Sequence, residues 1–267
     1  MHVPEPRGIQ SIEVGHRLLR ALEEAPGPTA LKVLAAKAGM SPTKAHYYLA
    51  SYARVGMVVQ NGPGGLYDLG PGAIRLGLAA MAHLDVLGLA RDIMFEVRDA
   101  TGEAVFLSVW GNRGPTIVHR VEGTHLSPLA IRVGSVLSPL SATGRAILST
   151  FTPNAIRDVV AAAIADAVPT DPWYGGTIES VMPLIDEVRR DGVARGRRTV
   201  MSESGFIGLA APILTFEGTA QAALSINGNS ERFDMRQDGP NVKALLAATA
   251  RVSQLAGAHR TPGAKTT

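Results

Sequence analysis

The sequence predicts an α+β protein with two folded parts, a small helical part and a larger part built on an antiparallel sheet. Three observations lead to this prediction. Three short helix patterns precede a glycine-rich hairpin within the first 70 residues. A long apolar helical stretch comes next. The remainder then groups strand patterns at both ends of a helical middle, which is typical of α+β domains.

The bulk properties exclude several classes of site and protein. The chain has 267 residues, of which 46% are hydrophobic and 18% charged, so two domains with well-packed cores are possible. It contains no cysteine, which excludes disulfides, thiolate metal sites and cysteine nucleophiles. No run reaches the ~18 apolar residues of a membrane span, and the N-terminus lacks the pattern of a signal peptide. We therefore expect a cytoplasmic protein.

The first part reads as three helices. Ser11 is the expected N-cap of the first helix, which ends at a run rich in proline. A second helix is expected over residues 30–38, followed by a glycine turn. Ser41 and Pro42 then begin the third helix as its N-cap and first residue, and this helix extends to Val55.

The outward face of the third helix is the main functional indication. At about 100° per residue, Ala45, Tyr48, Leu49 and Tyr52 face inward. The window from Thr29 to Tyr67 has four basic residues and no Asp or Glu, which favours a polyanion partner. Such a helix suits the major groove of double-stranded DNA, although an ordinary solvated helix or a protein-binding helix remains an alternative. The side chains expected to contact DNA, besides Ser41 and Pro42, are Thr43, Lys44, His46, Tyr47, Ser51 and Arg54.

The glycine-rich hairpin favours the winged variant of the helix-turn-helix. Short strands are expected at residues 57–59 and 66–69, joined by the sequence Asn-Gly-Pro-Gly-Gly. This gives a winged helix-turn-helix domain over residues 9–70. A linker helix is expected over residues 71–90, with so many apolar side chains that another element or another chain must cover it.

Residues 91–260 are expected to form the second domain, which would bind an effector. Their expected strands and helices, in chain order, are strands at 104–110, 116–122 and 126–133, helices at 141–151, 154–167 and 177–191, strands at 198–201, 206–214 and 219–226, and a last helix at 233–258.

No catalytic constellation is visible in the second domain. Ser202 to Gly205 lack the first glycine of a nucleophile elbow, and the seven histidines are scattered without metal-ligand spacing. We therefore expect no enzyme, no metal and no cofactor, with a serine hydrolase using Ser204 or Ser225 as an alternative. A helix that begins near Ser141 with hydroxyls beside it, and no acid nearby, could instead bind an anion or simply be capped.

The whole chain resembles the IclR family of bacterial transcription regulators. The resemblance begins at Ser11 and is carried by several segments in the family's order, namely TALKVLAAKAGMSPTKAHYYL, GGLYDLGPGAIRLG, GSVLSPLSATGRAIL, GLAAPI and AALSINGNSERF. It implies a winged helix-turn-helix that binds operator DNA, a linker helix that pairs two subunits, and a second domain similar to a GAF fold. It also implies a small organic carboxylate as effector and a homodimer or dimer of dimers.

The resemblance also assigns residues to the two sites. In the family the position of Tyr47 is commonly arginine, whose planar guanidinium differs from a phenol in what it can bind. The matching effector-binding positions are the backbone amides of the helix start, two polar residues on the last strand and two pocket-wall residues, namely Ala142, Thr143, Gly144, Ser225, Asn227, Phe206 and Gly208.

Overall fold

The computed structural model describes residues 8–62, 65–82, 85–125, 131–168, 173, 175–196 and 205–258. The chain divides into two compact units, Met1–Leu84 and Asp85–Thr267, and the division falls within the predicted linker at 71–90. Each unit has its own hydrophobic core. In the described part of the chain, no helix is both long and apolar enough to cross a bilayer.

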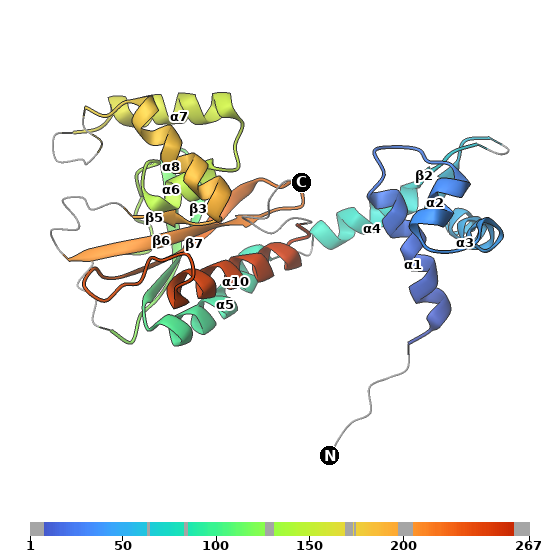
Figure 1. The fold of residues 1–267 in the computed structure, drawn as a ribbon, viewed down its shortest axis with the longest axis horizontal. Helices are drawn as coiled ribbons and strands as arrows, with labels where there is room; N and C mark the ends of the chain where they lie inside the picture. The colour runs from blue at the N-terminus through green and yellow to red at the C-terminus, as the bar shows by residue number, and fades with distance from the viewer. Residues whose placement is uncertain are drawn as a thin grey trace, which may run out of the picture. The chain divides into compact units, whose positions relative to one another are not determined.

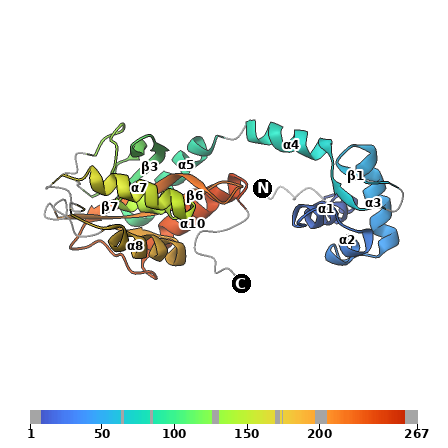
Figure 2. The ribbon, with the colours of Figure 1, turned by 90° about the horizontal axis from the view of Figure 1, so that it is seen from above.

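The first unit packs three helices against a small hairpin. Its elements are α1 (Gln10–Glu23), α2 (Leu31–Lys37), α3 (Pro42–Arg54), β1 (Val58–Gln60), β2 (Tyr67–Leu69) and α4 (Pro71–Ala82). Figure 2 shows α1, α2 and α3 gathered around one another. Their contact is apolar, with Leu18, Leu34 and Leu49 from the three helices fully buried. The expected cap was wrong, since Ile9 is the N-cap of α1 and Ser11 lies inside the helix.

A third segment, at Thr29 before α2, pairs with strand β2 of the hairpin. β1 and β2 pair antiparallel, with Val58 opposite Leu69 and Gln60 opposite Tyr67. Thr29 and Tyr67 also exchange two backbone hydrogen bonds, of 2.8 and 2.9 Å. Tyr67 is therefore paired on both sides, and this fixes the hairpin to the segment that leads into α2.

The second unit is an α+β domain around one antiparallel sheet, which confirms the predicted fold class. Its strands are ordered β4-β3-β7-β6-β5, and every described neighbouring pair is antiparallel. The elements are α5 (Val86–Thr101), β3 (Ala104–Gly111), β4 (Gly114–Val121), α6 (Ala142–Leu148), α7 (Pro153–Ala165), α8 (Ile178–Asp191), β5 (Ala194–Arg195), β6 (Phe206–Leu214), β7 (Ala220–Asn229) and α10 (Pro240–Leu255).

Helices cover both faces of this sheet. Figure 1 shows α5 and α10 on one face and α6, with α7 and α8, on the other. Because side chains alternate along a strand, Leu209 and Leu224 pack toward α5 and α10. Their neighbours Ala210 and Ala223 pack toward α6. Small residues on this second face allow α6 to lie close to the sheet.

Several expected elements differ from the structure. The expected helical stretch from 71 onward is two helices, and Asp85 caps the second by accepting a hydrogen bond from the amide of Gly88 at 2.8 Å. The last helix begins at Pro240 and not at 233. Residues 131–133 form no strand, and the short strand β5 was not expected. The expected strands at 126–130 and 198–201 lie outside the described residues.

A buried carboxylate lies where β3 begins. Glu103 is 4% exposed, and its carboxylate oxygen lies 3.2 Å from a guanidinium nitrogen of Arg232 and 3.7 Å from the Nδ1 atom of His125. Burial raises the pKa of the Glu103 carboxyl, against the opposing effects of Arg232 and His125. The native state therefore retains this proton to a higher pH than the unfolded chain does.

We expect Glu103→Gln to change how stability depends on pH. As pH rises through the unfolded and then the raised folded pKa, the native state binds more protons, so Glu103 lowers the free energy of unfolding across that window. In Glu103→Gln the free energy of unfolding should not show this decline with rising pH. Urea unfolding can be followed by the two tryptophans, both of which lie in the second unit. Glu96→Gln, on the exposed side of α5, is the matched control, and equal pH slopes in both variants would contradict the assignment.

Candidate functional site

The third helix, α3, is positioned by its cap and by its apolar face. The Ser41 side chain accepts a hydrogen bond from the amide of Lys44 at 3.3 Å, and Pro42 occupies the first turn, as predicted. Ala45 and Leu49 are fully buried in the core of the first unit. This leaves the opposite face of the helix in solvent.

The predicted DNA-contacting side chains share that exposed face. All of the residues in this set are exposed, namely Ser41, Pro42, Thr43, Lys44, His46, Tyr47, Ser51 and Arg54. Tyr47 has 70% of its surface exposed. The Ser51 hydroxyl donates to the Tyr47 carbonyl at 2.9 Å, so its proton is used within the helix. Tyr47 is therefore the largest side chain presented at the middle of this face.

The electrostatics of α3 favour an anionic partner. Within the described residues, neither Lys44 nor Arg54 forms an ion pair. His46 lies beside the hairpin, with its Nδ1 atom 3.5 Å from the Tyr67 hydroxyl. On the inner side, burial raises the pKa of the Tyr52 phenol, which therefore stays neutral. The exposed face thus presents two cations, Lys44 and Arg54, without an acidic partner in the part of the chain that is described.

In the second unit, the predicted effector residues of the strands share one sheet face. Gly208 on β6 and Asn227 on β7 are cross-strand partners, and a Cβ at 208 would overlap with the side-chain oxygen of Asn227. Ser225, two residues before Asn227, is buried on the same face beside Phe106. Phe206 lies two residues before Gly208 and has the same orientation. These four residues form a polar and apolar patch toward α6.

The start of α6 borders this face of the sheet. Ser141 caps α6 by accepting a hydrogen bond from the amide of Gly144 at 3.1 Å, so one of the three predicted amides is already bonded. The amides of Ala142 and Thr143 have no partner among the described residues. A Cβ at residue 144 would overlap with the carbonyl of Pro139, which explains the glycine at this close approach.

Two further residues on this face were missed by sequence reasoning. The Ser108 side chain on β3 is fully buried, and its hydroxyl has no hydrogen-bond partner in the described structure. The Arg120 guanidinium on β4 lies over the Phe106 ring at 5.5 Å and donates to the Ile131 carbonyl. A serine inside the apolar run AVFLSVW was a possible signal for Ser108. An orphan hydroxyl at a buried position is a candidate for a ligand contact.

The alternative of a metal or serine enzyme gains no support from the described residues. No group of three or more metal-ligating side chains occurs among them. Ser202 to Ser204 lie outside the described residues, so the hydrolase alternative with Ser204 has no described geometry. Ser225 is buried within β7, with Phe106 and Ala210 as its cross-strand partners.

Family models match most of the chain. The model described as "IclR helix-turn-helix domain" matches residues 11–62. The model described as "Bacterial transcriptional regulator IclR C-terminal" matches residues 78–254. These two matches follow each other in the same order as the two units.

Individual relatives agree with these matches. The glycerol operon regulatory protein of Streptomyces griseus is 30% identical, and the alignment covers 95% of this chain and 99% of that protein. The crystal structure of HmgR from Pseudomonas aeruginosa is 32% identical with a TM-score of 0.76, covering 94% of this chain and 99% of that one. An IclR homolog from Microbacterium hydrocarbonoxydans, solved in complex with 4-hydroxybenzoate, has the same fold at 21% identity and a TM-score of 0.52, covering 92% and 98%. The curated relatives are named as regulators, in agreement with the expectation of a protein that is not an enzyme.

Proposed function

The chain belongs to the IclR family of bacterial transcription regulators, and we propose that α3 reads operator DNA while the second unit binds a small organic carboxylate. The protein is thus a ligand-responsive, DNA-binding regulator of transcription. The observation that carries the assignment of α3 is its exposed face, on which Lys44 and Arg54 have no acidic partner among the described residues. Phosphate oxygens are the complementary partners for such cations.

The effector site is proposed on the sheet face beside α6. The amides of Ala142 and Thr143 supply donors suited to a carboxylate, and Ser225 and Asn227 supply polar groups nearby on β7. Gly208 leaves room above the sheet that the Asn227 side chain partly occupies. A relative of the same fold was solved with 4-hydroxybenzoate, which supports an aromatic acid as one candidate ligand.

The apolar surface of α4 supports a dimer. Ile74, Leu76 and Leu78 are 61%, 63% and 60% exposed, which is unusual for three large apolar side chains on one short helix. A second copy of the chain would cover them, and would also place two α3 helices on two half-sites. Effector binding would then change the relative population of the DNA-binding arrangements through the linker.

A gel-shift with the DNA upstream of the protein's own gene tests the proposed function. We expect binding that is selective against competitor DNA, weakens steeply with salt and responds to at least one organic acid. The absence of selective, salt-sensitive binding under every ligand condition would contradict the proposal.

We expect Tyr47→Arg to strengthen operator binding at low salt. The new guanidinium would stand at the middle of the exposed face, where it can contact phosphate or guanine. If it contacts phosphate, the slope of log affinity against log salt should steepen by about 0.9 per chain. Tyr47→Phe is the control, because it removes only the hydroxyl. Unchanged affinity and slope in Tyr47→Arg would place residue 47 away from the DNA.

A further inference from the structure

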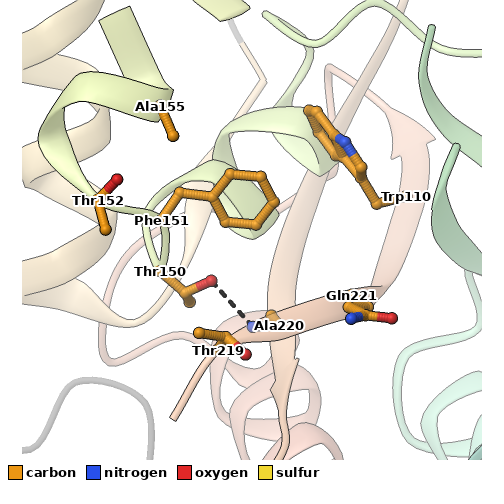
Figure 3. A pocket seen from close by; sticks show the side chains of 8 residues that line it. All are labelled: Trp110, Thr150, Phe151, Thr152, Ala155, Thr219, Ala220 and Gln221. Atoms are coloured by element: carbon orange, nitrogen blue, oxygen red, sulfur yellow. Dashed lines mark hydrogen bonds between the residues drawn. The ribbon is translucent and has the colours of Figure 1, made fainter. Parts of the chain in front are cut away.

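A cavity lies on the α6 side of the sheet, at the end of that helix opposite the proposed effector site. Its volume is about 530 Å³, within the range of roughly 300 to 1,000 Å³ common for small-molecule sites. Figure 3 shows Trp110 from β3 and Phe151 from the turn after α6 above the start of β7. The cavity lies entirely within the second unit, and its lining residues are all described.

This cavity is separate from the proposed effector site. Gln221 on β7 borders the cavity, and Ser225, further along the same strand, belongs to the effector patch. Four residues of a strand separate them, a distance of about 13 Å. The two sites are also at opposite ends of α6, whose seven residues span about 10 Å.

The lining determines the chemistry of a suitable ligand. The rings of Trp110 and Phe151 lie edge to face, with centroids 5.4 Å apart, and offer a surface for another aromatic ring. None of the eight lining residues is charged. A charged ligand would therefore lose hydration here without gaining an opposite charge.

Two lining groups retain hydrogen-bonding capacity for a polar substituent. The Thr152 side chain makes no capping hydrogen bond at the start of α7, and Gln221 is exposed. The Thr150 hydroxyl is already committed, since it donates to the Ile147 carbonyl at 2.8 Å and accepts from the Ala220 amide at 2.9 Å. The free groups therefore lie at the rim, while the aromatic pair forms the wall.

The cavity also contacts the end of α6 directly. The Arg189 side chain on α8 donates to the carbonyls of Ser149 at 2.8 Å and Phe151 at 3.2 Å, which fixes the turn that carries Phe151. The wall is thus held in place by neighbouring elements before any ligand arrives. A site that is formed in advance binds without the cost of ordering its side chains.

We infer that this cavity is a second ligand site, which binds a small neutral aromatic compound with one hydrogen-bonding substituent. It differs from the proposed carboxylate site in the charge of its ligand. Its occupant contacts the turn at the end of α6, so it can alter the effector site at the start of the same helix.

Calorimetric titration of the full-length protein with indole, without DNA, tests the inference. Indole is neutral and planar with one donor, and indole-3-acetate is the charged counterpart with the same ring. Ala155→Phe, which fills the cavity from α7, should weaken indole binding at least tenfold. Ala161→Phe, at an exposed position of the same helix, should leave it unchanged. Phe151→Leu removes the aromatic wall but keeps an apolar side chain, and should also weaken binding.

Three outcomes would overturn the inference. The first is that the natural protein gives no binding heat at millimolar indole. If Ala155→Phe also changes the sedimentation of the protein in that case, the cavity is a contact with a second copy of the chain. The second is equal indole affinity in Ala155→Phe and Ala161→Phe. The third is an equal loss of indole and indole-3-acetate binding in Ala155→Phe, which would contradict the neutral class. Since no DNA is present, these results do not depend on the proposed regulatory function.

Discussion

Replacing both Lys44 and Arg54 by alanine is expected to abolish selective operator binding at physiological salt. If each cation neutralises one phosphate, the proposed dimer loses four such contacts, and the slope of log affinity against log salt should fall by about 3.6, from 0.9 per contact. Fluorescence anisotropy with labelled operator, repeated over a salt series, gives both the affinity and the slope. The fold should persist, because both side chains are exposed and neither forms an ion pair within the described residues.

A matched control removes the same charge elsewhere. Lys243→Ala with Arg251→Ala takes two exposed cations from α10 in the second unit. We expect little change in the salt slope, since these positions are outside the proposed interface. Equal losses in the two double variants would mean that total charge, and not α3, controls binding. Selective DNA binding that survives in Lys44→Ala with Arg54→Ala would contradict the role of these two cations, whereas regulation that stays intact without selective DNA binding would favour a protein partner for the helix-turn-helix.

Replacing Asn227 by leucine is expected to remove the response to the effector while leaving operator binding intact. The leucine lacks the polar group that faces Gly208, so a carboxylate ligand should bind at least tenfold more weakly. A thermal-shift screen of organic acids that includes 4-hydroxybenzoate selects the ligand, and calorimetry then compares the variant with the natural protein.

Gln221→Leu is the control for this experiment. It makes the same polar-to-apolar change on β7, but at the cavity lined by Trp110 and Phe151. The selected acid should therefore keep its affinity. If Gln221→Leu reduced acid binding and Asn227→Leu did not, the effector site would lie at the cavity and the assignment to the α6 start would be wrong.

The sequence predicted the bounds of an element correctly where those bounds depend on neighbouring residues only. Ser41 and Pro42 fixed the start of α3 because a cap and a proline in the first turn depend on neighbouring residues only. The same reasoning placed β6 at Phe206–Leu214, since its apolar run is bounded by turn residues.

The errors arose where tertiary contacts overrode the local pattern. Phe233 extended the apolar pattern and drew the expected last helix seven residues too early. In the structure it packs into the core from an irregular segment, and the Arg236 side chain donates to the Asp234 carboxylate within that segment. The helix then begins at Pro240, where the Gly239 backbone is extended.

In the candidate sites too, residues set by local periodicity could be predicted and residues set by tertiary contacts could not. The exposed face of α3 followed from helical periodicity, so its residues could be selected from the sequence. The apolar run around Ser108 marked this serine as unusual, but its unbonded hydroxyl could not be predicted, because only the sheet register places β3 beside β7 and brings Ser108 opposite Ala223. A buried hydroxyl becomes conspicuous only after its neighbours have been found to leave it without a partner.

The contact between Gly208 and Asn227 has a consequence for engineering this protein as a biosensor. The amide of Asn227 occupies the space that a side chain at 208 would need, so the two positions share one volume. Libraries that vary either position alone would mostly produce steric overlap or an empty hole. Varying the two codons together, large with small, would change the selectivity of the sensor while the backbone of the sheet stays in place.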